Sequence, residues 1–100
     1  MFSLVVSQRA KARIAEVSDY IYEQWGQKSH RKFLSELERC LKIIEINSNS
    51  FRCNIEMQEV HECVVTYYNI LYYAVKGDNI VILSLEDTRM QPVDISFLLK

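Results

Sequence analysis

The sequence predicts an α+β fold in the order β-α-α-β-β-β, with a helical hairpin packed on one face of a small antiparallel sheet. Two observations predict it. Apolar residues recur at helical spacing in two stretches between residues 8 and 46, and three short β-rich segments follow between residues 58 and 86. With 100 residues, 49% of them apolar and 25% charged, the chain has the size and composition of one globular domain spanning residues 1–100.

The N-terminal half is read from capping residues and periodicity. A β-rich run at residues 2–6 predicts a strand, and Ser7 is suited to cap a first helix that runs from about 8 to 25. Gly26 can take the positive φ that ends this helix, and Ser29 is expected to cap the second after a connection of about three residues. The predicted core-facing stripes are Ala10, Ile14, Val17 and Ile21 in the first helix, and Phe33, Leu37, Cys40 and Ile44, widened by Leu34 and Leu41, in the second.

Three strands are predicted at about 58–66, 69–75 and 80–86, with turns at 68–69 and 76–79 in which Gly77 and Asn79 tolerate positive φ. The last two strands are apolar on both alternating faces, whereas a strand with one wet face should alternate. The helical hairpin can cover only one face. Two coverings of the other face stay open: the C-terminal tail, residues 93–99, or a partner chain.

Composition excludes several classes of protein. No run approaches the roughly 18 apolar residues of a membrane span, and the apolar residues of the N-terminus precede its charges, the opposite of a secretory signal, so a cytoplasmic location is expected. The three cysteines lack CxxC spacing. His61 and Cys63 share a strand face but make only half of a zinc site, so neither a metal nor another cofactor is expected.

The charges are unevenly distributed. Residues 1–50 carry eight Lys/Arg and six Asp/Glu, while residues 51–100 carry four and seven. The second predicted helix is the basic part, and the predicted sheet is acidic. A protein that grips a polyanion normally presents the reverse on its working surface. The basic stripe consists of Lys28, Arg31, Lys32, Arg39 and Lys42.

An ordered set of short motifs runs through nearly the whole chain. The set is Ser7-x-x-Ala10, Tyr20-Ile21-x-x-x-Trp25-Gly26, Phe33 with Leu37, Leu71-Tyr72-Tyr73-x-Val75, Ile80-x-Ile82-Leu83, and Asp87-x-Arg89-x-x-Pro92. In this order the motifs resemble the RelE/ParE toxin superfamily. The resemblance implies the toxin of a type II toxin–antitoxin pair, held inactive by a cognate antitoxin segment that wraps it. It leaves the oligomeric state open, a homodimer included.

The two branches of this superfamily have different targets. RelE-like members bind the ribosome and cut mRNA, whereas ParE-like members poison DNA gyrase. The long hairpin with Trp25-Gly26 at its corner is more similar to the ParE side. A gyrase-directed toxin is therefore the favoured interpretation, with a ribosome-dependent endoribonuclease as the first alternative and an inactive binding module of the same fold as the second.

A metal-independent ribonuclease needs an acid or base that works near neutral pH, and cations that converge on one phosphate. On this interpretation His61 would be the acid or base, and Arg89 and Arg52 would clamp the phosphate. The stretch around His61 argues against it because it holds three carboxylates where RelE-like enzymes place basic residues. These carboxylates belong to Glu56, Glu59 and Glu62.

A toxin that acts on a protein needs a shaped surface rather than a catalytic set. Structural interpretations stand beside each contact: Trp25 as a core staple of the hairpin, the basic stripe as a solvated face, and Asp87 with Arg89 as a local ion pair that anchors the tail. The candidate residues for antitoxin or target binding are Tyr72, Tyr73, Trp25, Arg31, Lys32, Arg39 and Arg89, with Tyr20 and Tyr22 beside the corner.

Overall fold

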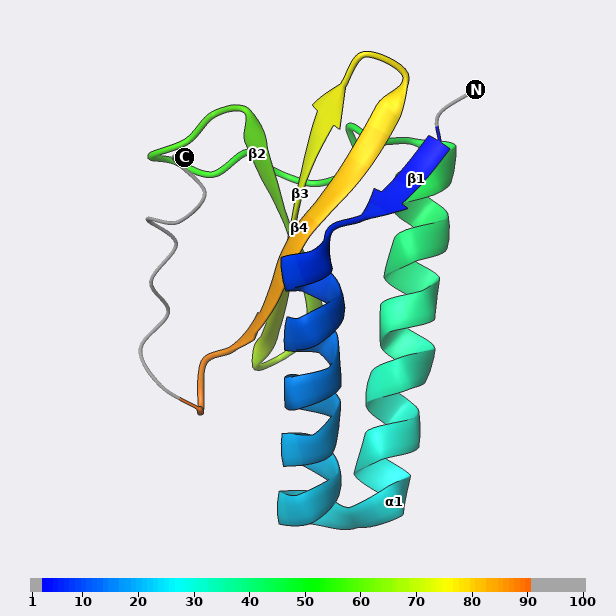
Figure 1. Cartoon of the computed structure of the whole chain (residues 1–100), viewed down its shortest axis with the longest axis vertical. Coiled ribbons are helices and arrows are strands. Elements are labelled where there is room, and N and C mark those ends of the chain that lie inside the picture. Colours follow the sequence, from blue (N-terminus) through cyan, green and yellow to red (C-terminus); the bar gives the residue numbers. More distant parts are fainter. Residues whose placement is uncertain (1–2, 91–100) are drawn as a thin grey trace.

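A two-armed helix packs against one face of a four-stranded sheet in the computed structural model, which describes residues 3–90 (Figure 1). The predicted α+β class and element order are confirmed. The elements are β1 (Ser3–Val6), α1 (Gln8–Ile46), β2 (Val60–Thr66), β3 (Asn69–Lys76) and β4 (Asn79–Asp87). No helix within this part of the chain has both the length and the apolarity that crossing a bilayer requires.

The two arms of α1 are joined at a single residue, and in Figure 1 they run side by side in opposite directions. Gly26 has φ 87° and ψ −173°, and it is the one non-helical residue of α1. This region of backbone space is open essentially to glycine alone. Because Gly26 reverses the chain by itself, the helix resumes at Gln27, and the prediction that Ser29 caps the second arm after a three-residue connection is wrong.

Ser7 caps the start of α1, as predicted. Its Oγ accepts a hydrogen bond of 3.0 Å from the backbone N–H of Ala10 and donates one of 3.2 Å to the carbonyl oxygen of Leu83 in β4. The residue thus satisfies a free N–H of the first turn and ties the helix to the sheet.

Replacing Ser7 with alanine is expected to lower the free energy of unfolding by about 1–2 kcal/mol, because both hydrogen bonds are lost. Chemical denaturation measures this. The matched control is Ser35→Ala on the exposed face of the second arm, which is expected to change the free energy by less than about 0.5 kcal/mol. Equal effects of the two substitutions would contradict the capping role.

The sheet is mixed rather than purely antiparallel. The strand order is β1-β4-β3-β2; β2, β3 and β4 form an antiparallel meander, but β1 pairs parallel to β4 with Ser3 opposite Asn79. Short hairpins force antiparallel pairing within the meander. The long helical hairpin that separates β1 from the meander imposes no such direction, so this detail of the predicted sheet is wrong.

The strand bounds lie within two residues of those predicted, while the first turn is shifted by one residue and the second is shorter than predicted. Residues 67–68 and 77–78 form the turns, and Gly77 has φ 61°. Asn79 already belongs to β4, and within residues 3–90 no residue other than glycine has a positive φ. The positive φ expected at Asn79 is therefore not observed, because a two-residue connection needs only Gly77 to adopt it.

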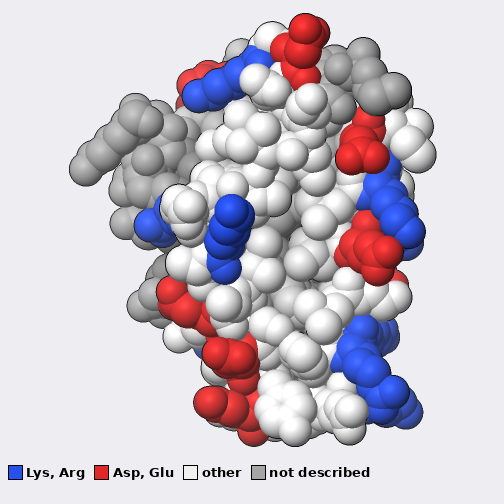
Figure 2. Space-filling model, turned by 45° about the vertical axis from the view of Figure 1, so that its right-hand side comes forward, with Lys and Arg blue, Asp and Glu red and all other residues white. Residues whose placement is uncertain are grey.

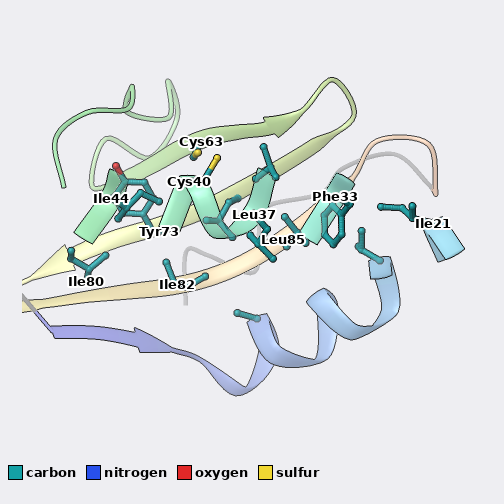
Figure 3. Packing of buried hydrophobic residues seen from close by; sticks show 14 residues of the cluster. Ile21, Phe33, Leu37, Cys40, Ile44, Cys63, Tyr73, Ile80, Ile82 and Leu85 are labelled. Carbon is teal, nitrogen blue, oxygen red and sulfur yellow. The ribbon is translucent and has the colours of Figure 1, made fainter. Parts of the chain in front are cut away.

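The main core lies between α1 and the sheet, as Figure 3 shows. The predicted stripes supply it: Ala10, Val17, Ile21, Phe33, Leu37, Cys40 and Ile44 are all buried, whereas Leu34 is 41% exposed. These side chains meet alternate residues of the strands. The sheet contributes Cys63, Val65, Leu71, Tyr73, Ile80, Ile82 and Leu85.

A second, smaller cluster lies on the other face of the sheet. Met57, from the loop between α1 and β2, packs there with Val60 and Tyr72, and all three are at most 4% exposed. The chain's own loop therefore covers part of the face that the sequence analysis left to the tail or a partner. The tail segment, residues 93–99, lies outside the described residues.

Candidate functional site

Arg89 is held in place at the end of β4 by the carboxylate of Asp87. Its Nη2 and Nε donate hydrogen bonds of 2.7 and 3.0 Å to this carboxylate, and its backbone N–H donates a third of 2.8 Å. The Asn69 side chain of β3 donates a fourth, also of 2.8 Å. Burial alone raises the pKa of Asp87, but these hydrogen bonds outweigh burial and hold its pKa below the ordinary value. The predicted ion pair is confirmed.

Two aromatic rings enclose the Arg89 guanidinium. Its central carbon lies 3.9 Å from the ring centroid of Trp25 and 4.1 Å from that of Tyr68. Tyr20 meets Trp25 edge to face at 5.5 Å. A cation is attracted to the face of an aromatic ring, and the Arg89 guanidinium makes this contact with both rings. Arg89 therefore joins the corner of the helical hairpin to the β2–β3 turn and the end of β4. Trp25 is 46% exposed, so the interpretation of Trp25 as a core staple is wrong.

A cavity of about 290 Å³ opens beside this stack, and we call it the corner pocket. Three segments that are distant in sequence build it: the hairpin corner, the β2–β3 turn and the residue after β4. Four of its ten lining residues are aromatic, and two of these rings reach into solvent, since Tyr67 is 89% and Tyr68 40% exposed. The lining residues include Trp25, Lys32, Phe33, Tyr67, Tyr68 and Arg89.

The basic stripe of α1 divides into two parts. Arg39 pairs with Glu36 at 2.9 Å and Lys42 with Glu38 at 3.1 Å. Three cations near the hairpin turn, which we call the corner cations, form no ion pair or hydrogen bond with another residue of the described range 3–90. They are Lys28, Arg31 and Lys32, and all are exposed.

The position of the corner cations is locally unfavourable. Lys28 lies in the first turn of the second arm, where the helix dipole disfavours a cation by about 0.3–1 kcal/mol. It is also three and four residues from Arg31 and Lys32, and each such like-charge pair costs about 0.2–0.5 kcal/mol. At the lower end of the molecule in Figure 2, basic side chains lie on the right and acidic side chains on the left, whereas the two kinds alternate higher on the right-hand edge. The hairpin therefore presents two edges of opposite charge only near its turn.

His61 and Arg52 lie at the other end of the sheet. The His61 ring stacks on Tyr73 at 4.9 Å, and its Nδ1 lies 3.0 Å from the carbonyl oxygen of Phe51. Arg52 pairs with Glu62 at 3.2 Å. His61 is opposite Tyr73 of β3, whereas Arg89 lies beside the turn that precedes Asn69, the first residue of β3. Tyr73 is four residues from Asn69, which corresponds to about 13 Å along the strand. His61 and Glu62 point to opposite faces of the sheet, so the Arg52 guanidinium, which pairs with Glu62, lies on the face away from the His61 ring. The structure therefore does not bring His61, Arg52 and Arg89 together.

The cysteines do not join His61 in a site. Cys63 points into the core beside Cys40 (Figure 3), and its hydrogen bond with Cys40, together with burial, raises its pKa. The thiol of Cys53 lies 3.9 Å from Nδ1 of His61, the nitrogen that faces the Phe51 carbonyl. Within residues 3–90 no three His, Cys, Asp or Glu side chains gather in a way that could hold a metal ion.

The two tyrosines of β3 offer little surface for contact. Tyr73 is fully buried, and its hydroxyl donates a hydrogen bond of 2.7 Å to the carbonyl oxygen of Ser48. Tyr72 is 3% exposed within the second cluster. Burial raises the pKa of each to about 12. Among the candidate binding residues, the structure therefore gathers Trp25, Lys32 and Arg89 at one pocket, whereas Arg31 and Arg39 lie on the same arm as Lys32 but do not line the pocket.

Sequence reasoning missed two features. Tyr67 and Tyr68 are not among the candidate binding residues, yet they form a wall of the corner pocket. Two adjacent aromatic residues in a two-residue turn were the available signal, because turns favour small polar residues. Arg13 lies outside the predicted apolar stripe of the first helix, yet it binds Glu86 of β4 at 3.1 Å and its side chain is 12% exposed. No local pattern marks that pair.

The family model for the ParE toxin of the type II toxin–antitoxin system parDE matches residues 4–92. A search of curated proteins gave no match. Among solved structures, the chromosomal ParDE system from P. aeruginosa has a TM-score of 0.73 at 20% identity and covers 87% of this chain and 96% of that one.

Two structures from Staphylococcus aureus are also similar. The YoeB dimer has a TM-score of 0.58 at 16% identity and covers 85% of this chain and 94% of its own. The YoeB–YefM complex has a TM-score of 0.56 at 16% identity, with coverage of 86% and 95%. At these identities the structures establish the shared fold, and the family model covers most of the chain. The chain belongs to the ParE toxin family and is the toxin of a type II toxin–antitoxin system.

Proposed function

We propose that this toxin inhibits growth in the cytoplasm by binding a protein target, DNA gyrase, through the corner of its helical hairpin, and that a cognate antitoxin holds it inactive. One observation carries the proposal. The corner pocket joins exposed aromatic rings to cations without ion-pair partners in the described range, and the centres of protein interfaces are enriched in aromatic residues and arginine.

The electrostatics near His61 support the same choice. Cleavage of RNA places negative charge on a phosphate, which cations must stabilise. Arg52 is already paired with Glu62, and Arg89 with Asp87 at a distant point of the sheet. The geometry therefore supports action on a protein over cleavage of mRNA. The ParDE toxin–antitoxin system supports an antitoxin partner. The YoeB–YefM complex and the YoeB dimer show that one protein of similar fold binds another protein and also pairs with itself.

The test is induction of the toxin without antitoxin, followed by plasmid supercoiling and by primer extension on translated mRNA. Growth is expected to stop and supercoiling to fall while mRNA stays intact. The variant His61→Ala is expected to keep inhibition within about twofold of the parent, because His61 packs on Tyr73 away from the corner pocket. Purified gyrase with relaxed plasmid and ATP provides the direct assay.

Three other outcomes would overturn the proposal. Cleaved mRNA with restored growth in His61→Ala would identify a ribonuclease. Growth arrest with unchanged supercoiling would exclude gyrase. Unaffected growth at every level of toxin would identify an inactive binding module of the same fold.

A further inference from the structure

We propose that the corner pocket binds an acidic segment of the target protein, with one large apolar side chain in the cavity and carboxylates on the corner cations. The identity of the target rests on the proposed function, but the chemistry of the segment follows from the pocket itself. Lys32 connects the two halves of the site, since it lines the cavity and is also a corner cation.

The size and walls of the cavity determine which side chain of the acidic segment can bind in it. Its volume of about 290 Å³ suits a single large side chain rather than an extended ligand. Trp25 and Tyr68 already hold the Arg89 guanidinium between them, and Asp87 neutralises it, so Arg89 forms a wall and is not a free cation. An apolar or aromatic side chain is the guest that such walls bury most favourably.

The corner cations determine which charge the bound segment carries beside its apolar side chain. They have no ion-pair partner within residues 3–90, they repel one another, and Lys28 opposes the dipole of its own helix. Carboxylates from a partner would relieve all three penalties upon binding. Farther along the second arm, Arg39 and Lys42 pair with glutamates one turn away, so within this arm the unpaired cations lie at the hairpin corner.

A nucleic acid would fit the pocket less well. Binding of nucleic acid gains most of its affinity from many phosphate contacts, whereas this chain has a net charge of −1 and only three corner cations. Tyr67 could stack on a base. However, Arg89 is occupied by Asp87 and unavailable to a phosphate.

The first experiment uses Trp25 as a reporter, because it is the only tryptophan of the chain and lies in the pocket. Peptides selected from a random displayed library against the whole toxin are expected to carry acidic residues within one helical turn of Phe, Leu or Met. Their binding should change the Trp25 fluorescence. The substitution Lys32→Glu should weaken binding by about tenfold or more, since it reverses an interfacial charge pair.

Lys42→Glu is the matched control, because it makes the same change of net charge at the far end of the same arm, and binding should stay within about twofold. Lys28→Glu and Lys32→Glu should leave the melting temperature equal or higher, since Lys28 lies in the first turn of its arm, where an acid is favourable, and each substitution removes the like-charge pair between Lys28 and Lys32. A failure to fold therefore cannot explain a loss of binding.

Several results would overturn the inference: a library that yields no binders, peptides that are neutral or basic, peptides insensitive to Lys32→Glu, or an oligonucleotide such as oligo(dT) that binds at the pocket more tightly than the selected peptides.

The second experiment separates this inference from the proposed function. If the parent toxin inhibits purified gyrase, the triple variant Lys28→Glu, Arg31→Glu, Lys32→Glu should raise the concentration for half-inhibition by about tenfold or more. If the triple variant inhibits gyrase as well as the parent does, the pocket assignment is refuted and the gyrase target is not. A triple variant that stays toxic but is no longer neutralised by the antitoxin would also refute the pocket assignment. A parent toxin that never inhibits gyrase would refute the target, while the peptide selection still decides the chemistry of the pocket.

Discussion

The substitution Arg89→Met is expected to lower the free energy of unfolding by about 3–5 kcal/mol, a large share of the 5–15 kcal/mol typical of a domain of this size. The reason is the carboxylate that stays behind. The Asp87 side chain is fully buried, and two of its four hydrogen bonds come from the Arg89 guanidinium. Removing the cation leaves a buried charge with only the Asn69 amide and one backbone N–H. Urea denaturation at pH 7 measures the loss.

The dependence on pH checks this explanation. In the parent the pKa of Asp87 is lowered, so its contribution to stability is present above the ordinary carboxyl pKa and is lost as the pH falls through the lowered value. In Arg89→Met, burial remains without the guanidinium, so the pKa should rise. The variant should therefore become more stable, relative to the parent, as the pH falls from 7 toward 5. A constant difference between the two proteins over this range would contradict the role of Asp87.

A loss of toxicity on substitution of Arg89 would not by itself identify a catalytic role for this residue. Sequence reasoning alone would take a harmless Arg89→Ala toxin as evidence that Arg89 clamps a phosphate. In the structure Arg89 joins three segments and neutralises a buried acid, so unfolding alone would abolish toxicity. His61→Ala and the corner-cation variants are the informative ones, because their side chains hold no comparable part of the fold together.

The substitution Gly26→Ala is expected to destabilise the hairpin by about 1–3 kcal/mol, the cost of a non-glycine residue in a sparsely populated backbone region. A Cβ at this position would meet no atom within 4 Å, so the penalty arises from the backbone and not from a clash. Alanine also favours the helical conformation, in which the two arms would continue as one straight helix. Such a helix cannot fold back on its own sheet, so a domain-swapped dimer becomes accessible.

Thermal denaturation and light scattering after gel filtration measure these two effects. The control is Gly77→Asn, which replaces the other glycine of positive φ at φ 61°. Asparagine tolerates this conformation, so that variant should stay close to the parent in stability and in mass. If Gly26→Ala were as stable and as monomeric as Gly77→Asn, the hinge role of Gly26 would be refuted.

The sequence predicted most of the fold because the decisive signals were local. The helical stripes ending at Ile21 and Ile44, the cap at Ser7 and the turn at Gly77 each depend on residues within a few positions of one another. The direction of β1 does not depend on nearby residues, because β1 pairs with a strand more than seventy residues away. Ser29 resembles a cap in isolation, but Gly26 makes it unnecessary.

The candidate site was only partly predictable for the same reason. Trp25, Lys32 and Arg89 were each named from sequence, but their meeting at one pocket depends on how the hairpin corner, the β2–β3 turn and the end of β4 pack together. Whether an aromatic residue is buried depends on the same packing. Tyr73 was expected to contact a partner and is buried in the core, whereas Trp25 had a plausible place in the core and is half exposed.

The position of β4 within the sheet has a consequence for synthesis of the toxin. Within residues 3–90 it is the last strand to be made, yet it lies between β1 and β3 and contacts α1 through Arg13 and Glu86. While a ribosome is still translating, β1 has no partner and the core lacks Ile80, Ile82 and Leu85. Pairings so distant in sequence form late in folding. A nascent toxin should thus stay harmless until nearly its whole chain has emerged, which gives an antitoxin made beforehand time to meet it before it folds.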